Sequence, residues 1–339
     1  MSGDPRKVTM VDVARSAGVS RATASRALAG EDTVTVEVFR RVHAAAEELG
    51  YLPEPEARSV RRDEAGSIGL IVPSSELGSF RGPFVGAPLQ GATAVIAEAS
   101  RQPVLLLDGG RDPRPLVRYL DGGHVDAAVA ILLHESESLF RTLGELRCPV
   151  VYVGRPSTDL GTERSWVDAD HYHGARLAAR ALLEAGRRRM VTITGPMSYL
   201  PSQRRLDGFR DELADWGLAP LAVANAVEFT LQSGSMAMAT LMARAPEADG
   251  LFASSDLLAA GALRVLKASR RRVPDDVAVV AFDDTVVAAT SVPALTSVHQ
   301  PLREMGARAA ELALEALEDP SVLPRQIELP TTLTTRESA

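Results

Sequence analysis

The stretch VTMVDVARSAGVSRATASRALAGEDTVTVEVFRRVHAAAEELG, residues 8–50, predicts three short helices, the first two joined by a tight turn. Thr9 is a suitable N-cap for the first helix, and Asp12 follows three residues later, where a carboxylate stabilises the positive helix end. Gly18 supplies the backbone freedom that ends this helix, and Ser20 can cap the next one. The pattern indicates a compact module near the amino terminus.

The second helix of this module has a polar and basic outward face over a backing of small apolar residues. Its outward side chains are Arg21, Ala22, Thr23, Ser25 and Arg26, and its backing is Ala24, Ala27 and Leu28. Such a helix after a glycine-containing turn is typical of a DNA-binding helix-turn-helix, whose second helix enters the major groove by its N-terminal end. The alternative to a DNA-binding unit is a generic three-helix module that binds a protein or has no binding partner.

A third helix is expected to close the small core of this module. Thr35 can cap it and Gly50 can end it. The apolar positions expected to face inward are Val38, Val42, Ala45, Ala46 and Leu49.

The composition is that of a globular protein with an uneven distribution of charge. The 339 residues suffice for two or three domains, and the formal net charge is -7, which by itself does not favour nucleic acid. Residues 1–30 nevertheless hold five basic side chains (Arg6, Lys7, Arg15, Arg21, Arg26) and two acidic ones (Asp4, Asp12), a net charge of +3. A DNA-facing surface needs local positive charge, so the overall acidity does not exclude one.

Several classes of site and location are disfavoured by the sequence. The single cysteine, Cys148, excludes a disulfide framework and a multi-cysteine metal site, and it fits a reducing cytoplasm. No apolar signal segment or membrane span is present, so we expect a cytoplasmic protein without membrane association. His171 and His173 are spaced by two, which places them on different sides of a helix, so we expect no metal and no cofactor. Phosphate-loop, nucleophile-elbow and HExxH motifs are absent, which argues against an enzyme.

Residues 51–67 form a linker that contains Pro53 and Pro55, and here the chain resembles a known family. The runs VTMVDVARSAGVSRATASRALAG, ELGYLPEPEARSV and SIGLIVP closely resemble the LacI/GalR family of bacterial transcription regulators, and the resemblance extends over nearly the whole chain. It implies that the linker folds into a hinge helix on operator DNA and wedges an apolar side chain into the minor groove. The residues that match the hinge positions are Arg58, Ser59 and the wedge itself, Val60.

The match to the family has departures that bear on DNA binding. Glu54 stands where relatives usually have a polar capping residue, and Phe39 stands where they often have a phosphate-contacting arginine. Val60 is smaller than the usual leucine. These departures predict a hinge weaker than the family norm. The DNA-binding residues that we expect are Thr9, Ser20, Arg21, Ala22, Thr23, Ser25, Arg26, Arg58, Ser59 and Val60.

The remainder of the chain alternates strand-like and helix-like segments. The apolar runs at 67–73, 103–109, 126–133, 149–154, 190–195, 250–255 and 277–284 are typical of buried strands, with helical patterns between them. Repeated βα units predict parallel sheets covered on both faces, and their number favours two doubly wound lobes with a cleft at the carboxyl ends of the strands.

The resemblance implies that this body is a two-lobed α/β core like the type I periplasmic binding proteins, following an N-terminal all-α helix-turn-helix domain. The chain would then divide into a headpiece at 1–52, a hinge at 53–66 and an effector-binding and dimerisation core at 67–339. Within the core, the first lobe is expected at about 67–165 and 294–325, and the second at about 166–293 and 326–339.

The resemblance also indicates candidate effector contacts near the strand ends. Asp283 matches the family's ligand-binding aspartate, whose carboxylate can accept paired hydroxyl hydrogen bonds, and Arg205 suits a hydroxyl pair or an anion. Gly154 stands where some relatives have an aspartate, which departs from the usual sugar site. The full set that we expect is Phe84, Val85, Gln203, Arg205, Phe229, Ser255, Asp256, Asp283 and Gln300.

Together these features predict a homodimeric DNA-binding transcription regulator, a repressor, that reads a pseudo-palindromic double-stranded operator. A small-molecule effector, of the sugar type or a related polar metabolite, would control its operator affinity. The alternative is a solute-binding receptor of the transport type, which shares the core fold but would have a signal peptide and no helix-turn-helix.

Overall fold

The computed structural model of the chain describes residues 9–28, 34–49, 66–72, 83–108, 112–131, 142–143, 146, 148–156 and 164–339. The chain divides into two compact units, residues 1–65 and 66–339. Among the described residues, the helices are too short or too polar to cross a membrane.

The first unit contains the three expected helices, α1 (Met10–Ser16), α2 (Arg21–Leu28) and α3 (Val36–Glu48). The Asp12 carboxylate accepts hydrogen bonds from the Thr9 backbone N–H (3.0 Å) and from the Thr9 hydroxyl (2.6 Å), which confirms the predicted cap. Gly18 has φ of +63°, a conformation that favours glycine, and the turn there directs the chain into α2. The Ser20 hydroxyl accepts from the Thr23 N–H (3.1 Å) and caps α2.

The core of this unit is built almost entirely from small side chains, so the three helices pack closely together. Leu49 was expected in this core, and that prediction is wrong. Because Leu49 lies just beyond the end of α3, its side chain is 36% exposed. The buried set is Val13, Ala14, Ala17, Ala24, Ala27, Val42, Ala45 and Ala46.

The second unit contains two six-stranded sheets. The first sheet comprises β1 (Ser67–Val72), β2 (Gln102–Leu107), β3 (Ala127–Ile131), β4 (Val150–Val153), β5 (Ser165–Ala169) and β11 (Gln326–Leu329). The second comprises β6 (Met190–Thr194), β7 (Ala222–Asn225), β8 (Gly250–Ala253), β9 (Ala278–Asp283), β10 (Thr296–His299) and β12 (Thr332–Thr334). The helices are α4 (Pro83–Glu98), α5 (Arg114–Asp121), α7 (His171–Glu184), α8 (Leu200–Asp215), α9 (Leu231–Arg244), α10 (Asp256–Ala268), α11 (Val286–Thr290) and α12 (Leu302–Glu318), with a short 3-10 turn η4 (Pro320–Val322).

The strand orders are β11-β5-β4-β3-β1-β2 and β12-β10-β9-β8-β6-β7, and all neighbours are parallel except β10 and β12. The chain passes between the sheets after β5, after β10 and after β11, each time a few residues beyond the boundaries expected at about 165, 294 and 325. Asp170 N–H donates to the Leu329 carbonyl (2.9 Å), and the Thr331 hydroxyl donates to the Asp170 carbonyl (3.2 Å), so the first and third crossovers are hydrogen-bonded to each other.

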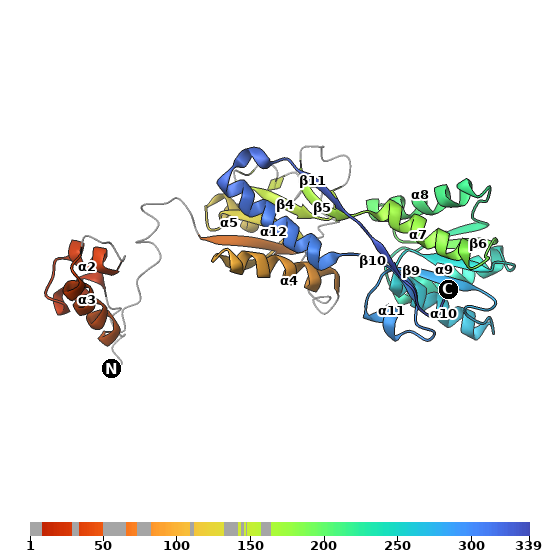
Figure 1. Ribbon diagram of the computed structural model, residues 1–339, viewed down its shortest axis with the longest axis horizontal. Helices are drawn as coiled ribbons and strands as arrows, with labels where there is room; N and C mark the ends of the chain where they lie inside the picture. Colours follow the sequence, from red (N-terminus) through yellow and green to blue (C-terminus); the bar gives the residue numbers. More distant parts are fainter. Residues whose placement is uncertain are drawn as a thin grey trace. The chain divides into compact units, whose positions relative to one another are not determined.

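Helices cover both faces of each sheet, as the alternating pattern predicts (Figure 1). In the first sheet, α4 and α12 share one apolar core and α5 contributes to the core of the opposite face. In the second sheet, α9 and α10 cover one face and α7 and α8 the other. Each sheet is therefore the middle layer of its own three-layer lobe.

Helices α4 and α12 lie side by side although some 200 residues separate them in sequence (Figure 1). Their backbones approach closely at two glycines. A Cβ at Gly91 would lie 1.9 Å from the Arg303 carbonyl oxygen, and a Cβ at Gly306 would lie 2.0 Å from the Pro88 carbonyl oxygen. Only glycine fits at these two points, because backbone carbonyls cannot move aside as a flexible side chain can.

We expect Gly306→Ala to destabilise the core unit by about 1–3 kcal/mol, because its methyl group forces α4 and α12 apart. Urea unfolding of the full chain measures the change. Glu304→Ala, on the exposed side of the same helix, is the control and should stay within about 0.5 kcal/mol of the parent. Equal stabilities of the glycine and alanine chains would contradict this packing.

Candidate functional site

The outward face of α2 is the first candidate site. Arg21, Ala22, Ser25 and Arg26 are exposed and Thr23 is half-exposed, while Ala24 and Ala27 are buried. The Arg26 Nε donates to the Ala22 carbonyl (3.3 Å), and no acidic side chain lies within α2 itself. The helix thus presents small polar groups and two guanidinium groups, which are the donors that DNA phosphates and guanine edges accept.

Of the other expected DNA contacts, Thr9 and Ser20 are helix caps and three lie outside the described residues. Thr9 is exposed, but its hydroxyl is hydrogen-bonded to Asp12 in the cap of α1. Phe39 is exposed on α3 and its ring lies 4.2 Å from the ring of His43. The hinge residues Arg58, Ser59 and Val60 lie outside the described residues.

The second candidate site lies at the carboxyl end of the second sheet. In an open α/β sheet ligands bind beyond this edge, near the point where the strand order reverses. Here that point lies between β6 and β8, and the next strand, β9, ends in Asp283. A group of buried polar side chains occupies this edge, with Arg205 at its centre.

Arg205, on α8, is 5% exposed and makes contacts on all sides. Its Nη1 donates to the Ser254 carbonyl and to Asp283 Oδ1, the latter at 3.4 Å. Its guanidinium carbon lies 3.8 Å from the centre of the Phe282 ring, a cation-π contact. Burial lowers the pKa of Arg205, and Asp283 opposes that shift.

Asp283 joins two of the expected effector residues. Its Oδ1 accepts a hydrogen bond from Gln300 Nε2 (2.6 Å) in addition to the contact from Arg205. Burial raises its pKa to about 8, although the Arg205 charge pulls the value down. The residue has φ of +113°, in a region that non-glycine residues rarely adopt, so its backbone is strained. Strain of this kind concentrates at binding sites.

Asp256 belongs to the same group and its carboxylate is fully engaged. It accepts from the Ser297 hydroxyl (2.7 Å) and from the Thr285 N–H (2.6 Å), and burial raises its pKa. Ser255 caps α10 by accepting from the Leu258 N–H (3.2 Å). Asp256 therefore fixes the loop that follows Asp283, while Ser255 fixes the start of α10.

The remaining expected contacts are not joined to this group. Gln203 is exposed and donates to the Met197 carbonyl (2.7 Å), and Phe229 packs against the second-sheet core with its ring 6.3 Å from that of Tyr199. In the first lobe, Val85 is 1% exposed and lies in the apolar core with Phe84 packed against it.

The structure adds two residues that the sequence did not indicate, Asp168 and His171. His171 Nε2 lies 3.2 Å from Asp168 Oδ1, and its Nδ1 faces Arg205. His171 and His173 were expected to lie on different sides of a helix. His171 is buried against Asp168, while His173 is exposed. Within the described part of the chain no group of three or more metal-ligating side chains is found.

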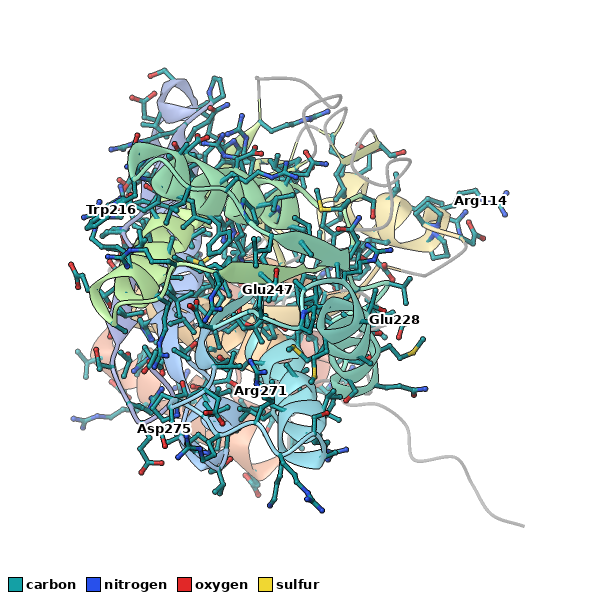
Figure 2. The ribbon with its side chains drawn as sticks, turned by 90° about the vertical axis from the view of Figure 1, so that its right-hand side faces the viewer. Arg114, Trp216, Glu228, Glu247, Arg271 and Asp275 are labelled. Carbon is teal, nitrogen blue, oxygen red and sulfur yellow. The ribbon has the colours of Figure 1, made fainter. Side chains whose placement is uncertain are left out.

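Charged side chains at the other end of the second sheet are remote from this site. The loops before β8 and β9 carry Glu247, Arg271 and Asp275, labelled in Figure 2. These loops lie at the amino ends of the parallel strands, opposite Asp283. Arg271 donates there to the carbonyls of Pro246 (3.2 Å) and Ala248 (2.8 Å), which indicates a structural role.

The chain combines a helix-turn-helix unit, whose second helix is polar and basic, with a two-lobed α/β core. This combination defines a class of DNA-binding regulators whose core has the fold of ligand-binding proteins. Two family models match the chain: bacterial regulatory proteins, lacI family, at residues 9–54, and the periplasmic binding protein-like domain at residues 179–339.

Full-length relatives agree with these matches. The HTH-type transcriptional regulator CelR of Thermobifida fusca is 38% identical over 335 residues, which span 98% of each chain. The ribose operon repressor of Halalkalibacterium halodurans is 30% identical over 97% of this chain and 96% of its own length. The chain belongs to the lacI family of bacterial regulatory proteins, and it is a DNA-binding transcriptional regulator rather than a transport receptor or an enzyme.

Solved structures show the same architecture. A CelR–cellobiose complex is 37% identical, with a TM-score of 0.75, and the match covers 98% of this chain and 100% of that one. The lac repressor dimer bound to operator and the anti-inducer ONPF has a TM-score of 0.84 at 22% identity, covering 98% and 99% of the two chains, which shows the shared fold.

The raised pKa of Asp283 predicts a pH dependence of stability. Between its ordinary value of 3.8 and about 8, the folded chain holds a proton that the unfolded chain has released. Stability from this group is therefore greatest at low pH and falls as the pH rises towards 8, by at most about 1.4 kcal/mol per pH unit.

Asp283→Asn should flatten this fall, as measured by urea unfolding between about pH 5 and pH 8. Asp121→Asn, an exposed substitution on α5, should leave the slope unchanged. An equally steep fall in the Asp283→Asn chain would show that Asp283 ionises normally.

Proposed function

We propose that this regulator is a cytoplasmic homodimeric repressor whose affinity for a pseudo-palindromic operator is controlled by a neutral sugar. Residues 1–52 act as the DNA-reading headpiece, 53–66 as the hinge and 67–339 as the core that binds effector and dimerises. Two headpieces would read the two half-sites, so the symmetry of the operator mirrors that of the dimer.

The exposed face of α2 is the observation that supports the DNA-reading role. Arg21, Ala22 and Arg26 would read base edges, while Ser20, Thr23 and Ser25 would contact phosphates or bases. Arginine forms paired hydrogen bonds with guanine, and small side chains let the helix approach the groove closely. Arg58, Ser59 and Val60 would complete the contact in the minor groove.

The charges around Arg205 support a neutral effector rather than an anionic one. Three buried carboxyl groups, Asp168, Asp256 and Asp283, accompany this one guanidinium. A phosphate group would add negative charge to a buried site that already has an excess of acids. A sugar hydroxyl can accept from Arg205 and donate to Asp283 at once. The CelR relative, whose solved complex holds cellobiose, gives a first compound to test.

Effector binding would act on DNA through the hinge. A ligand that binds more tightly to one arrangement of the two lobes shifts the population towards it. The hinge segments, which lead from the headpieces into the first lobes, would then be held at a different separation. The proposed effector contacts are Arg205, Asp283 and Gln300, while Asp256 shapes the loop after Asp283 and Ser255 caps α10. Phe84, Gln203 and Phe229 remain candidates for the rim of the site, whereas Val85 is buried in the first-lobe core.

If Arg26 reads a base, Arg26→Ala should weaken specific operator binding by about 1–3 kcal/mol and relax base preference at one position. Gel shifts on the DNA that flanks the protein's own gene, over a range of salt, measure both effects. Arg210→Ala, an exposed arginine on α8, is the matched control. A uniform loss across all sequences would instead assign Arg26 to a phosphate.

Cellobiose at about 100 times its dissociation constant should stabilise the chain by about 2.7 kcal/mol and change operator affinity. A thermal-shift series with cellobiose, glucose, ribose and their phosphates measures the first effect, and gel shifts measure the second. Binding of a sugar phosphate in preference to the neutral sugar would overturn the proposed effector class.

A further inference from the structure

His171 occupies an unusual position between two charged groups. It is the first residue of α7, directly after the crossover from β5, and it is 7% exposed. Its Nε2 lies 3.2 Å from Asp168 Oδ1 on one side. On the other side its Nδ1 lies 3.2 Å from Arg205 Nη2 and 3.4 Å from Arg205 Nε. The imidazole therefore bridges a carboxylate and a guanidinium.

The chemistry of these partners fixes the protonation of the ring. A guanidinium has only donors, so His171 Nδ1 must offer its lone pair to Arg205. The single ring proton then lies on Nε2, where it is donated to the Asp168 carboxylate. A doubly protonated ring would point an N–H at Arg205 and add a second positive charge beside it. Burial and the Arg205 charge accordingly lower the pKa of His171.

Asp168 is itself held in place by the backbone. Its Oδ2 accepts from the Arg155 N–H (3.0 Å), and its Oδ1 accepts from the Ala169 N–H (2.9 Å). Burial raises the pKa of Asp168, but His171 and then these two N–H groups outweigh burial and keep the pKa below its usual value. The carboxylate is thus a fixed, charged acceptor at the end of β5, in the first sheet.

The bridge determines which way the Arg205 guanidinium faces. Of its five N–H groups, Nη1 serves the Ser254 carbonyl and Asp283, and Nε with one N–H of Nη2 serves His171. Phe282 closes one face of the plane. The second N–H of Nη2 has no acceptor among these contacts, so the arrangement leaves one oriented donor for a ligand. Without His171, two N–H groups on one edge of the guanidinium would lose their acceptor.

We propose that Asp168 and His171 form a positioning pair, in which a neutral Nε2–H imidazole holds the Arg205 guanidinium in the orientation that binds the effector. This inference rests on the proposed function, because it assigns a role in binding the effector at Arg205. His171 acts through Arg205 and does not itself contact the effector.

The first test is the affinity of the full-length protein for cellobiose, measured by calorimetry. His171→Leu removes the acceptor and should weaken binding by about tenfold to a hundredfold, since a charged donor loses its partner. His171→Asn, whose Oδ1 can replace Nδ1, should restore most of the affinity. His173→Leu, the exposed histidine two residues later, is the matched control and should bind as the parent does.

Operator binding without ligand shows whether each variant is folded. If His171→Leu binds operator normally and binds cellobiose as tightly as the parent, the positioning role is overturned. The same conclusion follows if His171→Asn and His171→Leu lose affinity equally while both bind operator.

The second test reads the tautomer directly and does not depend on any ligand. Nitrogen NMR of the chain labelled at its six histidines, with His171→Asn for assignment, should show His171 as a neutral ring protonated at Nε2 that titrates only below its ordinary pKa of 6.5. An Nδ1-protonated ring, or a ring that titrates near its ordinary pKa of 6.5, would overturn the pair. Absence of cellobiose binding in the parent would count against the proposed effector alone, since the NMR result would still decide on the pair.

Discussion

The burial of one guanidinium constrains the arrangement of the whole second site. Moving a charged group out of water costs several kcal/mol even after relaxation, and this cost is offset only when partners surround it. Arg205 obtains those partners from β9, from the loop after β8 and from the start of α7. A buried donor left without its acceptor typically costs about 1–3 kcal/mol, and more when the donor is charged, so all three segments must keep their positions around Arg205. The strained backbone of Asp283 can persist because its carboxyl group is fixed by the same contacts.

This arrangement also explains why the site suits a polar, uncharged ligand. Its groups already satisfy one another: Gln300 donates to Asp283, and Ser297 donates to Asp256. A ligand that binds Asp283 or Asp256 must therefore replace existing hydrogen bonds with equally good ones, because an unsatisfied buried group costs about 1–3 kcal/mol. Hydroxyl groups, which both donate and accept, meet this demand better than apolar groups do. Selectivity would then come from the placement of donors and acceptors more than from buried area.

The sequence predicted those features that depend on neighbouring residues. The caps at Thr9 and Ser20 and the exposed face of α2 follow from local chemistry, and the structure confirms them. The doubly wound lobes followed from the alternation of apolar runs with helical patterns. Strand β5 was not predicted, because Asp168 interrupts its apolar run although the strand is buried.

The contacts of the effector site depend on residues far apart in the sequence. Asp283 and Arg205 were found through the resemblance, but the residues that hold them were not. His171 lies 34 residues from Arg205, and nothing local reveals that its ring faces a guanidinium rather than a metal or solvent. Leu49 was misplaced for a related reason. Helical spacing predicts which side of a helix faces the core, but it does not show at which residue the helix ends and leaves the core.

The pairing of α4 with α12 has a consequence for how the protein is made. The first lobe needs the glycine-to-carbonyl contact between residues 88–91 and 303–306, and its edge strand β11 comes from residues 326–329. A ribosome that synthesises the chain from its amino terminus completes the headpiece early, whereas the last strands of both lobes, β11 and β12, come only near the carboxyl end. The apolar face of α4, which α12 covers in the finished protein, remains without that cover while the second lobe from α7 to β10 is being made. The nascent chain therefore carries an uncovered apolar helix face for much of its synthesis, and the headpiece is finished long before the lobes that would regulate it.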